Sequence, residues 1–311
     1  MKVFIAGAYG MVGSAIVRRA PKNVEILTPS RSSLDLKNQD AVSAFFKTHQ
    51  PNVVIVAAAK VGGIEANRNH QKDFLVENLA IQNSIICEAS NTGVGTLVFL
   101  GSSCIYPKFT DQPISENSLL TGVLEPTNEA YAIAKIAGIK LVNSIANEEN
   151  RNFFSLMPTN LYGPNDNFDL LESHVPAALL RRFHEARKLN INEVVVWGSG
   201  NPRREFMHVD DMADACWYFI NKDLRGQLIN IGTGEDVSIR EFALKIAAIT
   251  GYKGKITFDE SKPDGTPRKL LNVEKAHNLG WHHKIDLQKG LELTYDWFLN
   301  ALEKDEVRGY Q

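Results

Sequence analysis

Three residues in the middle of the chain have the types and spacing of a carbonyl-reducing site. Tyr131 and Lys135 form a Y-x-x-x-K pair in a run that predicts a helix, so both side chains lie on one face. A nearby ammonium favours phenolate and lowers the pKa of the tyrosine, which can then exchange a proton with a carbonyl oxygen. Ser102, at the end of a predicted strand, can hydrogen-bond that oxygen. The set predicts hydride exchange with a nicotinamide, whose ribose Lys135 can hold.

The segment LVFLGSSCIYPK, residues 97–108, contains a fourth reactive side chain, Cys104. The segment begins as a buried strand and ends at a proline. Reduction of a carbonyl group requires a hydrogen-bond donor such as Ser102, but it does not require Cys104. From the residues alone, a lone cysteine more often packs in the protein interior than acts in catalysis. A serine at the end of a strand often only caps exposed backbone groups.

A glycine loop supplies a site for the nicotinamide cofactor. Gly7, Gly10 and Gly13 form G-x-x-G-x-x-G directly after the first predicted strand, and Met11 and Val12 begin the helix that follows. The first glycine permits a tight turn and the second lets backbone approach a pyrophosphate. The third allows close helix packing, with phosphate at the positive end of the helix. This position in the chain predicts dinucleotide binding rather than a structural turn.

The residues after the second predicted strand, VEILTPSR, indicate which dinucleotide is bound. An acidic residue here would receive the ribose hydroxyls of NAD, but Arg31 follows instead. An arginine can pair with the 2′-phosphate of NADP, which an acid would repel. The sequence therefore favours NADP(H), with Asp35 at the border of the adenine pocket. A solvated surface arginine is the alternative interpretation.

Composition excludes several other classes of protein. The 311 residues are 44% hydrophobic with a net charge of −2, which supports a real core and gives no basic footprint for nucleic acid. No run approaches the ~20 apolar residues that span a bilayer, so no membrane partner is expected. Cys87, Cys104 and Cys216 lack metal-ligand spacing. We expect a cytoplasmic protein without a disulfide scaffold or a metal site.

Short apolar strands alternate with longer amphipathic runs through the first half of the chain. Strands at KVFIAG, VEIL, NVVIVAAA, TLVFLGSS and FFSLMPTN are separated by helical runs, one of them over about residues 71–91. This alternation predicts an α/β fold with a Rossmann-type doubly wound parallel sheet. We expect an NADP-binding domain over residues 1–160, to which a later segment can return. Residues 161–311 are expected to form mainly a smaller α/β substrate-binding domain.

Several blocks of sequence resemble the GDP-L-fucose synthase family, the bifunctional epimerase/reductases among the extended short-chain dehydrogenases/reductases. The blocks are GAYGMVGSAI, AAAKVGGI, GSSCIYPK, EPTNEAYAIAKIAG, MPTNLYGPNDNF, VVWGSG, REFMHVDDMA and KPDGTPRK. They run from the first strand to Lys269. The resemblance implies conversion of GDP-4-keto-6-deoxy-D-mannose to GDP-L-fucose with NADPH, by a two-domain enzyme that is commonly a homodimer.

The resemblance also implies a role for Cys104. A 4-keto group acidifies the protons on C3 and C5, and in this family a cysteine and a histidine exchange them on opposite faces of the sugar. The matching residues here are Cys104 and His174, which also lies beside the cofactor. A thiolate is a plausible base and an imidazole a plausible acid near neutral pH. Cys104 would then serve epimerisation and Ser102 would serve reduction.

Further binding positions are carried over from the family. The nicotinamide-side loop corresponds to Pro158, Asn160 and Leu161. The positions that contact the GDP-sugar correspond to Arg182, Trp197, Arg204, Asp264 and Lys269. One departure concerns the glycine loop, where Tyr9 stands in place of the basic residue that family members often carry. Arg31 is therefore expected to bear more of the interaction with the 2′-phosphate.

Other functions remain open from the sequence. A related enzyme acting on another 4-keto GDP-sugar, of colitose or modified-heptose type, would use the same chemistry. A 4,6-dehydratase would place acidic partners after the catalytic serine, where this chain has Ser103 and Cys104. A 4-epimerase needs no cysteine–histidine pair. A noncatalytic NADP-binding sensor would not require Ser102, Tyr131 and Lys135 together.

Overall fold

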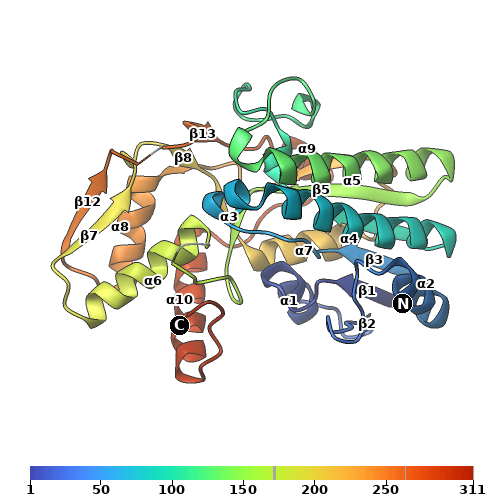
Figure 1. Cartoon of the computed structure of the whole chain (residues 1–311), viewed down its shortest axis with the longest axis horizontal. Helices are drawn as coiled ribbons and strands as arrows, with labels where there is room; N and C mark the ends of the chain where they lie inside the picture. The colour runs from blue at the N-terminus through green and yellow to red at the C-terminus, as the bar shows by residue number, and fades with distance from the viewer. Residues whose placement is uncertain (171–172, 263, 311) are drawn as a thin grey trace.

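A parallel β-sheet is the centre of the molecule (Figure 1). The computed structural model describes residues 1–170, 173–262 and 264–310, and six strands of this part form the sheet in the order β10-β5-β4-β3-β1-β2. The strands are β1 (Lys2–Ala6), β2 (Glu25–Leu27), β3 (Val53–Val56), β4 (Thr96–Leu100), β5 (Asn152–Pro158) and β10 (Leu228–Ile231). All neighbouring pairs are parallel, so their carboxyl ends meet at one edge.

The sheet is covered by helices on both faces because its strands are apolar on both sides. In β1, Val3 and Ile5 belong to one buried cluster, whereas Phe4 and Ala6 belong to the other. Helices α1 (Met11–Arg18) and α7 (Val209–Phe219) pack on the first face. Helices α2 (Gln39–His49), α4 (Gln71–Asn91) and α5 (Glu129–Glu148) pack on the second. The doubly wound α/β fold is confirmed.

A segment from the second half of the chain lies in this sheet. Strand β10 pairs in parallel with β5, and α7 lies against α1, where the indole Nε1 of Trp217 donates to the carbonyl of Ile16 at 2.9 Å. The strand INIGTG therefore extends the first sheet. The expected division at residue 160 stays an interpretation.

Other long helices pack around a second core, separate from the sheet, on the left of Figure 1. They are α6 (Val175–Lys188), α8 (Ile239–Thr250) and α10 (Leu287–Glu303). Strand β7 (Glu193–Trp197) pairs with β12 (Lys255–Asp259), and β6 (Asn160–Tyr162) pairs with β9 (Phe206–His208). A further sheet joins β8 (Arg203–Arg204) to β11 (Val237–Ser238) and β13 (Arg268–Lys269).

Short elements complete the described chain. They are α3 (Ile64–Asn69), α9 (Glu274–Asn278), η1 (Ser103–Ile105), η2 (Glu116–Ser118) and η3 (Pro126–Asn128). Within the described ranges, no helix combines the length and apolar character that crossing a bilayer requires.

Candidate active site

The glycine loop has the geometry of a dinucleotide cradle. Gly7 has a φ of +86°, and a Cβ at Gly13 would stand 2.0 Å from the Gly7 carbonyl oxygen, so helix α1 packs directly on the loop. A Cβ at Gly10 would meet Gly7 oxygen at 3.5 Å, an ordinary contact. The protein itself therefore leaves room for a side chain at Gly10. A phosphate approaching the start of α1, at Met11 and Val12, accounts for the missing side chain and fits the predicted cofactor.

The predicted 2′-phosphate site lies after β2 and is exposed. Arg31 and Asp35 are both open to solvent, and Asp35 accepts a hydrogen bond from the backbone of Lys37 at 3.0 Å, which closes a local turn. The phenol of Tyr9 donates to the carbonyl of Thr28 at 3.2 Å. Tyr9 therefore bridges the glycine loop to the residue that follows β2.

Lys135 lies at the carboxyl end of the sheet. Its side chain is 3% exposed, and its Nζ donates to the carbonyl of Leu100 at 2.8 Å, at the end of β4. The same nitrogen lies 4.8 Å from the ring centre of Phe99 and 5.9 Å from that of Tyr131. Burial lowers the pKa of Lys135 to about 7.

Tyr131 and Ser102 are brought together as predicted from their order in the chain, but the predicted direction of the tyrosine pKa is wrong. Burial, with a smaller contribution from Cys104, raises the pKa of Tyr131, and a hydrogen bond with Ser102 lowers it less. The expectation relied on the ammonium of Lys135. Desolvation of the phenol is the largest contribution, and Lys135 is itself buried, which lowers its own pKa and favours its neutral form. The phenol of Tyr131 therefore stays protonated near neutral pH.

Cys104 receives two donors from distant parts of the chain. It lies in η1, immediately after Ser102, whose hydroxyl accepts from the Cys104 backbone at 3.3 Å. The side-chain Nδ2 of Asn128 donates to its sulfur at 3.2 Å, and Nζ of Lys269 donates at 3.8 Å. The sulfur of Cys104 therefore meets an amide donor and a cation. Because Tyr131 hydrogen-bonds with Ser102, Tyr131 and Cys104 lie at the same end of β4.

His174 is the residue before α6, and its carbonyl accepts from Ala178 at 3.0 Å. His174 is exposed, and nearby protein atoms partly desolvate its imidazole, which lowers the pKa of that group. Among the residues that the structure describes, no hydrogen bond or ion pair joins His174 to Cys104 or Tyr131. The proton-returning role of His174 stays a prediction.

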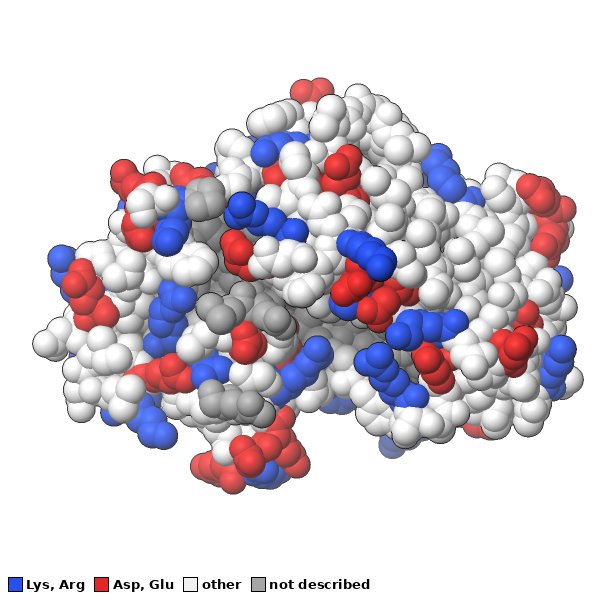
Figure 2. Space-filling view, in the orientation of Figure 1, with Lys and Arg blue, Asp and Glu red and all other residues white. Residues whose placement is uncertain are grey.

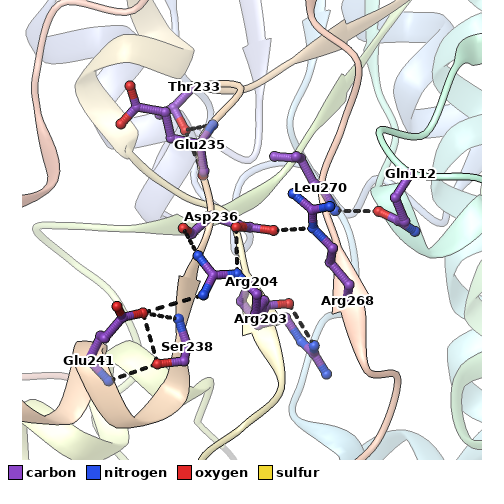
Figure 3. Close-up of polar contacts among 10 residues, drawn as sticks. All are labelled: Gln112, Arg203, Arg204, Thr233, Glu235, Asp236, Ser238, Glu241, Arg268 and Leu270. Atoms are coloured by element: carbon purple, nitrogen blue, oxygen red, sulfur yellow. Dashed lines mark hydrogen bonds and ion pairs between the residues drawn. The ribbon is translucent and has the colours of Figure 1, made fainter.

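Two of the predicted substrate contacts form a pair of neighbouring cations. Strands β8 and β13 run parallel with Lys269 opposite Arg204 and Arg268 opposite Arg203. Figure 3 shows Arg203 and Arg268 meeting at Asp236, whereas Arg204 extends away from it. Because successive strand residues face opposite sides, Arg204 and Lys269 share the other side.

The other predicted substrate contacts lie around the end of β7. Arg182 and Trp197 line one surface depression of about 370 Å³, where Arg182 donates to the Val195 carbonyl at 2.9 Å. Burial lowers the pKa of Arg182. Asp264 accepts from the backbone and the hydroxyl of Ser199, both at 2.7 Å, and so fixes the turn after Trp197.

The nicotinamide-side loop connects the two cores. Pro158 ends β5, whereas Asn160 and Leu161 begin β6. The amide of Asn160 donates to the carbonyl of Glu205 at 2.7 Å, which ties this loop to the segment between β8 and β9.

Figure 2 shows Lys and Arg side chains on both sides of the hollow between the two lobes. Among the described residues, no group of His, Cys, Asp or Glu has the geometry of a metal site.

Sequence reasoning missed Asn128 and Glu205. Asn128 ends η3, directly before α5, and stands three residues before Tyr131 within the block EPTNEAY, so its nearness in sequence to Tyr131 was an available signal. Glu205 is fully buried and accepts from the backbones of Thr233, Gly234 and Leu271 at 2.6, 2.8 and 2.9 Å. Nothing in its local sequence distinguishes it from a surface acid.

Comparison with known proteins identifies the family. The model of the NAD dependent epimerase/dehydratase family matches residues 3–232. The chain belongs to that family. Within it, GDP-L-fucose synthase from Escherichia coli (strain K12) is 53% identical to this chain, with 99% of each protein covered. GDP-L-colitose synthase from Yersinia pseudotuberculosis is 41% identical, covering 98% of this chain and 100% of that protein.

A solved structure of the family agrees in fold. The GDP-L-fucose synthetase from Naegleria fowleri bound to NADP has a TM-score of 0.89 and 28% identity, covering 98% of this chain and 94% of the other. The predictions of the GDP-L-fucose synthase family and of NADP(H) as the cofactor are confirmed.

Proposed function

We propose that this chain converts GDP-4-keto-6-deoxy-D-mannose to GDP-L-fucose by epimerisation at C3 and C5 and reduction at C4. The observation that carries the proposal is the convergence of two kinds of proton-transfer group at the end of β4. Ser102 and Tyr131 form the reducing set, and Cys104 lies beside them with its sulfur held by Asn128 and Lys269. An enzyme that only reduces the ketone does not need a second proton-transfer group such as Cys104.

Cys104 removes the proton from C3 or C5, and the electron pair moves to the 4-keto oxygen as an enolate. His174 returns a proton to the opposite face of the carbon, which inverts it. Its lowered pKa makes the imidazolium a stronger acid and reduces the protonated fraction at neutral pH. Cys104 and His174 then exchange their protons with water before the next cycle.

Tyr131 acts in the reduction. NADPH supplies the hydride to C4 when it is bound in the glycine loop. Tyr131 donates its proton to the C4 oxygen, and its raised pKa keeps the phenol protonated until that moment. Ser102 orients the same oxygen, and Lys135 holds the nicotinamide ribose at the end of the sheet.

The substrate's diphosphate is proposed to bind Arg204 and Lys269, with its base near Arg182 and Trp197. The neighbouring positions of Arg204 and Lys269 on parallel strands support a doubly charged ligand. Related GDP-sugars of colitose or heptose type are the alternative substrates, and the colitose-synthesising relative is the observation that favours them.

A homodimer and a cytoplasmic location complete the proposal. The exposed apolar side chains of Val76 and Ile133, on the adjacent helices α4 and α5, support the homodimer. Cys87, Cys104 and Cys216, all within the described residues, are free thiols, which supports a reducing compartment.

The test is incubation with GDP-4-keto-6-deoxy-D-mannose and NADPH in deuterated water, followed by stereochemical analysis of the product. We expect GDP-L-fucose carrying deuterium at C3 and C5. The variant Tyr131→Phe should lose reduction by about 100- to 10,000-fold while proton exchange at C3 or C5 continues. Normal ketone reduction by this variant would show that Tyr131 is not the donor. A reduced product that retains its original C3 and C5 stereochemistry would rule out the epimerase.

A further inference from the structure

The ammonium of Lys269 lies against the sulfur of Cys104. Its Nζ is 3.8 Å from Sγ, and the side chain is half-buried, so water screens the pair incompletely. The amide of Asn128 approaches the same sulfur at 3.2 Å. A cysteine used for packing is surrounded by apolar groups, whereas this sulfur meets a cation and an amide donor.

The backbone around Lys269 is fixed on both sides. The carbonyl of Lys269 accepts from the backbone of Glu205 at 3.3 Å, and the Glu205 carboxylate accepts from Leu271 at 2.9 Å. Between them, Leu270 donates to the side chain of Gln112 at 2.9 Å, as Figure 3 shows, and accepts from Ile114 at 2.8 Å. The strand therefore has little freedom to carry the ammonium away from Cys104.

The alternation of β13 determines which cation faces the sulfur. Arg268 is held by Asp236, which also binds Arg203. Burial alone would raise the pKa of Asp236, but the hydrogen bonds from Arg268 and Arg203 outweigh it and lower the pKa. Asp236 thus holds Arg268 on one side of the strand, and Lys269 extends from the opposite side.

We infer that Lys269, beyond contacting the GDP-sugar, is the positioning residue that holds Cys104 as a thiolate before the sugar arrives. This inference rests on the proposed function of Cys104 as the epimerisation base. Cys104 first loses its S–H proton to water, and Lys269 keeps its own charge and stabilises the anion. The thiolate then takes the C3 or C5 proton and becomes a thiol again, so proton and charge balance. One side chain thereby links diphosphate binding to the base.

The experiment measures alkylation of each cysteine by iodoacetamide, without substrate, on the full chain with saturating NADP⁺ at neutral pH. Peptide mass spectrometry follows Cys104 and uses Cys87 of the same molecule as the internal reference. Burial and the neighbouring Glu88 raise the pKa of Cys87, so it reacts more slowly. Lys269→Met keeps the length of the side chain and removes its charge. We expect the Cys104/Cys87 rate ratio to fall about threefold, because a roughly tenfold loss of thiolate is partly offset by higher intrinsic nucleophilicity.

Three further variants separate charge from other effects. Lys269→Gln should lower the ratio as Lys269→Met does, and Lys269→Arg should keep it within about twofold of the parent chain. Lys255→Met removes an exposed cation that pairs with Glu193, and it should leave the ratio unchanged. An unchanged ratio in Lys269→Met and Lys269→Gln, or an equal fall in Lys269→Arg, would overturn the inference. Absence of GDP-L-fucose from the unmodified chain would refute the proposed function and still leave the alkylation ratio readable.

Discussion

The cofactor loop and the cysteine site differ in how far along the chain their parts come from. Gly7 and Gly10 lie between β1 and α1 and Gly13 lies in the first turn of α1, so the loop comes from one short stretch of chain and its geometry depends on backbone conformation. Cys104 is surrounded by Asn128 and by Lys269, which is 165 positions away in sequence. The first site is a local consequence of residue order, whereas the second exists only when two cores meet. The two regions should therefore respond independently to substitution.

The largest expected effect is on the cysteine side. Cys104→Ser keeps the size of the side chain but replaces a thiol by a hydroxyl that is far harder to ionise. We expect deuterium exchange at C3 and C5 to fall about 100- to 10,000-fold, while the Kd for NADPH is unchanged. Isotope analysis of recovered sugar and fluorescence titration of NADPH measure the two quantities.

The matched control is Cys87→Ser, which alters a partly buried cysteine on α4 and should leave exchange intact. A parallel loss of NADPH affinity in Cys104→Ser would show that the two regions are coupled. Exchange at the parent rate would show that Cys104 is packing, and the epimerase proposal would lose its main local support.

A smaller effect is expected on the cofactor side. Arg31→Ala removes a cation proposed to pair with the 2′-phosphate, and Tyr9 leaves that position without a second basic residue. We expect NADPH to bind about 10- to 100-fold more weakly and NADH to be nearly unaffected, since a charge-assisted hydrogen bond contributes about 1.5 to 3 kcal/mol. Calorimetric titration with both cofactors measures the difference.

Lys37→Ala serves as the control for Arg31→Ala. It removes a nearby cation whose Nζ lies 3.5 Å from Glu77, and it should change neither affinity. Equal weakening of NADPH and NADH in Arg31→Ala would contradict the assignment of Arg31 to the 2′-phosphate.

The smallest effect concerns Asp166, in the loop between β6 and α6. Burial raises its pKa from 3.8 to about 7, and its Oδ2 has no hydrogen-bond partner in the described structure. A raised acid pKa means that the folded state holds the proton more tightly. The stability from that proton is present below pH 3.8 and is lost as pH rises through about 7.

Asp166→Asn keeps an acceptor for the backbone of Asn167, which lies 2.8 Å from Oδ1. We expect the free energy of unfolding of the variant, measured relative to that of the parent chain, to increase by about 2 kcal/mol as the pH rises from about 5 to about 8. Denaturant unfolding at the two pH values measures the gain. An equal change in stability at both values would mean that Asp166 is not protonated in the folded chain near neutrality.

Much of the fold follows from local pattern. The helix expected over residues 71–91 is α4, and the strands of the first half lie where apolar runs precede turn residues. These predictions succeed because a buried parallel strand must be apolar on both sides and needs a helical connection. The addition of β10 to the same sheet required the packing of α7 against α1, which no local pattern contains.

The tyrosine pKa shows the same limit within the site. The sequence places Tyr131 and Lys135 one helical turn apart, which suggests a phenolate beside an ammonium. Lys135 is buried and Tyr131 is half-buried in the structure, and desolvation penalises each charge, so the pKa of the phenol rises and that of the amine falls. Spacing determines which groups meet, whereas the surrounding atoms determine their charge.

By itself the sequence determined the cofactor loop, the doubly wound sheet, and the order of serine, tyrosine and lysine along it. Each depends on contacts within a few residues or on a strand and its next helix. Tertiary structure alone decided that Lys269 faces Cys104 and that Glu205 holds its strand in place. The physical reason is distance along the chain, because a cation affects a thiol only when folding brings the two within a few ångströms in a partly dry site.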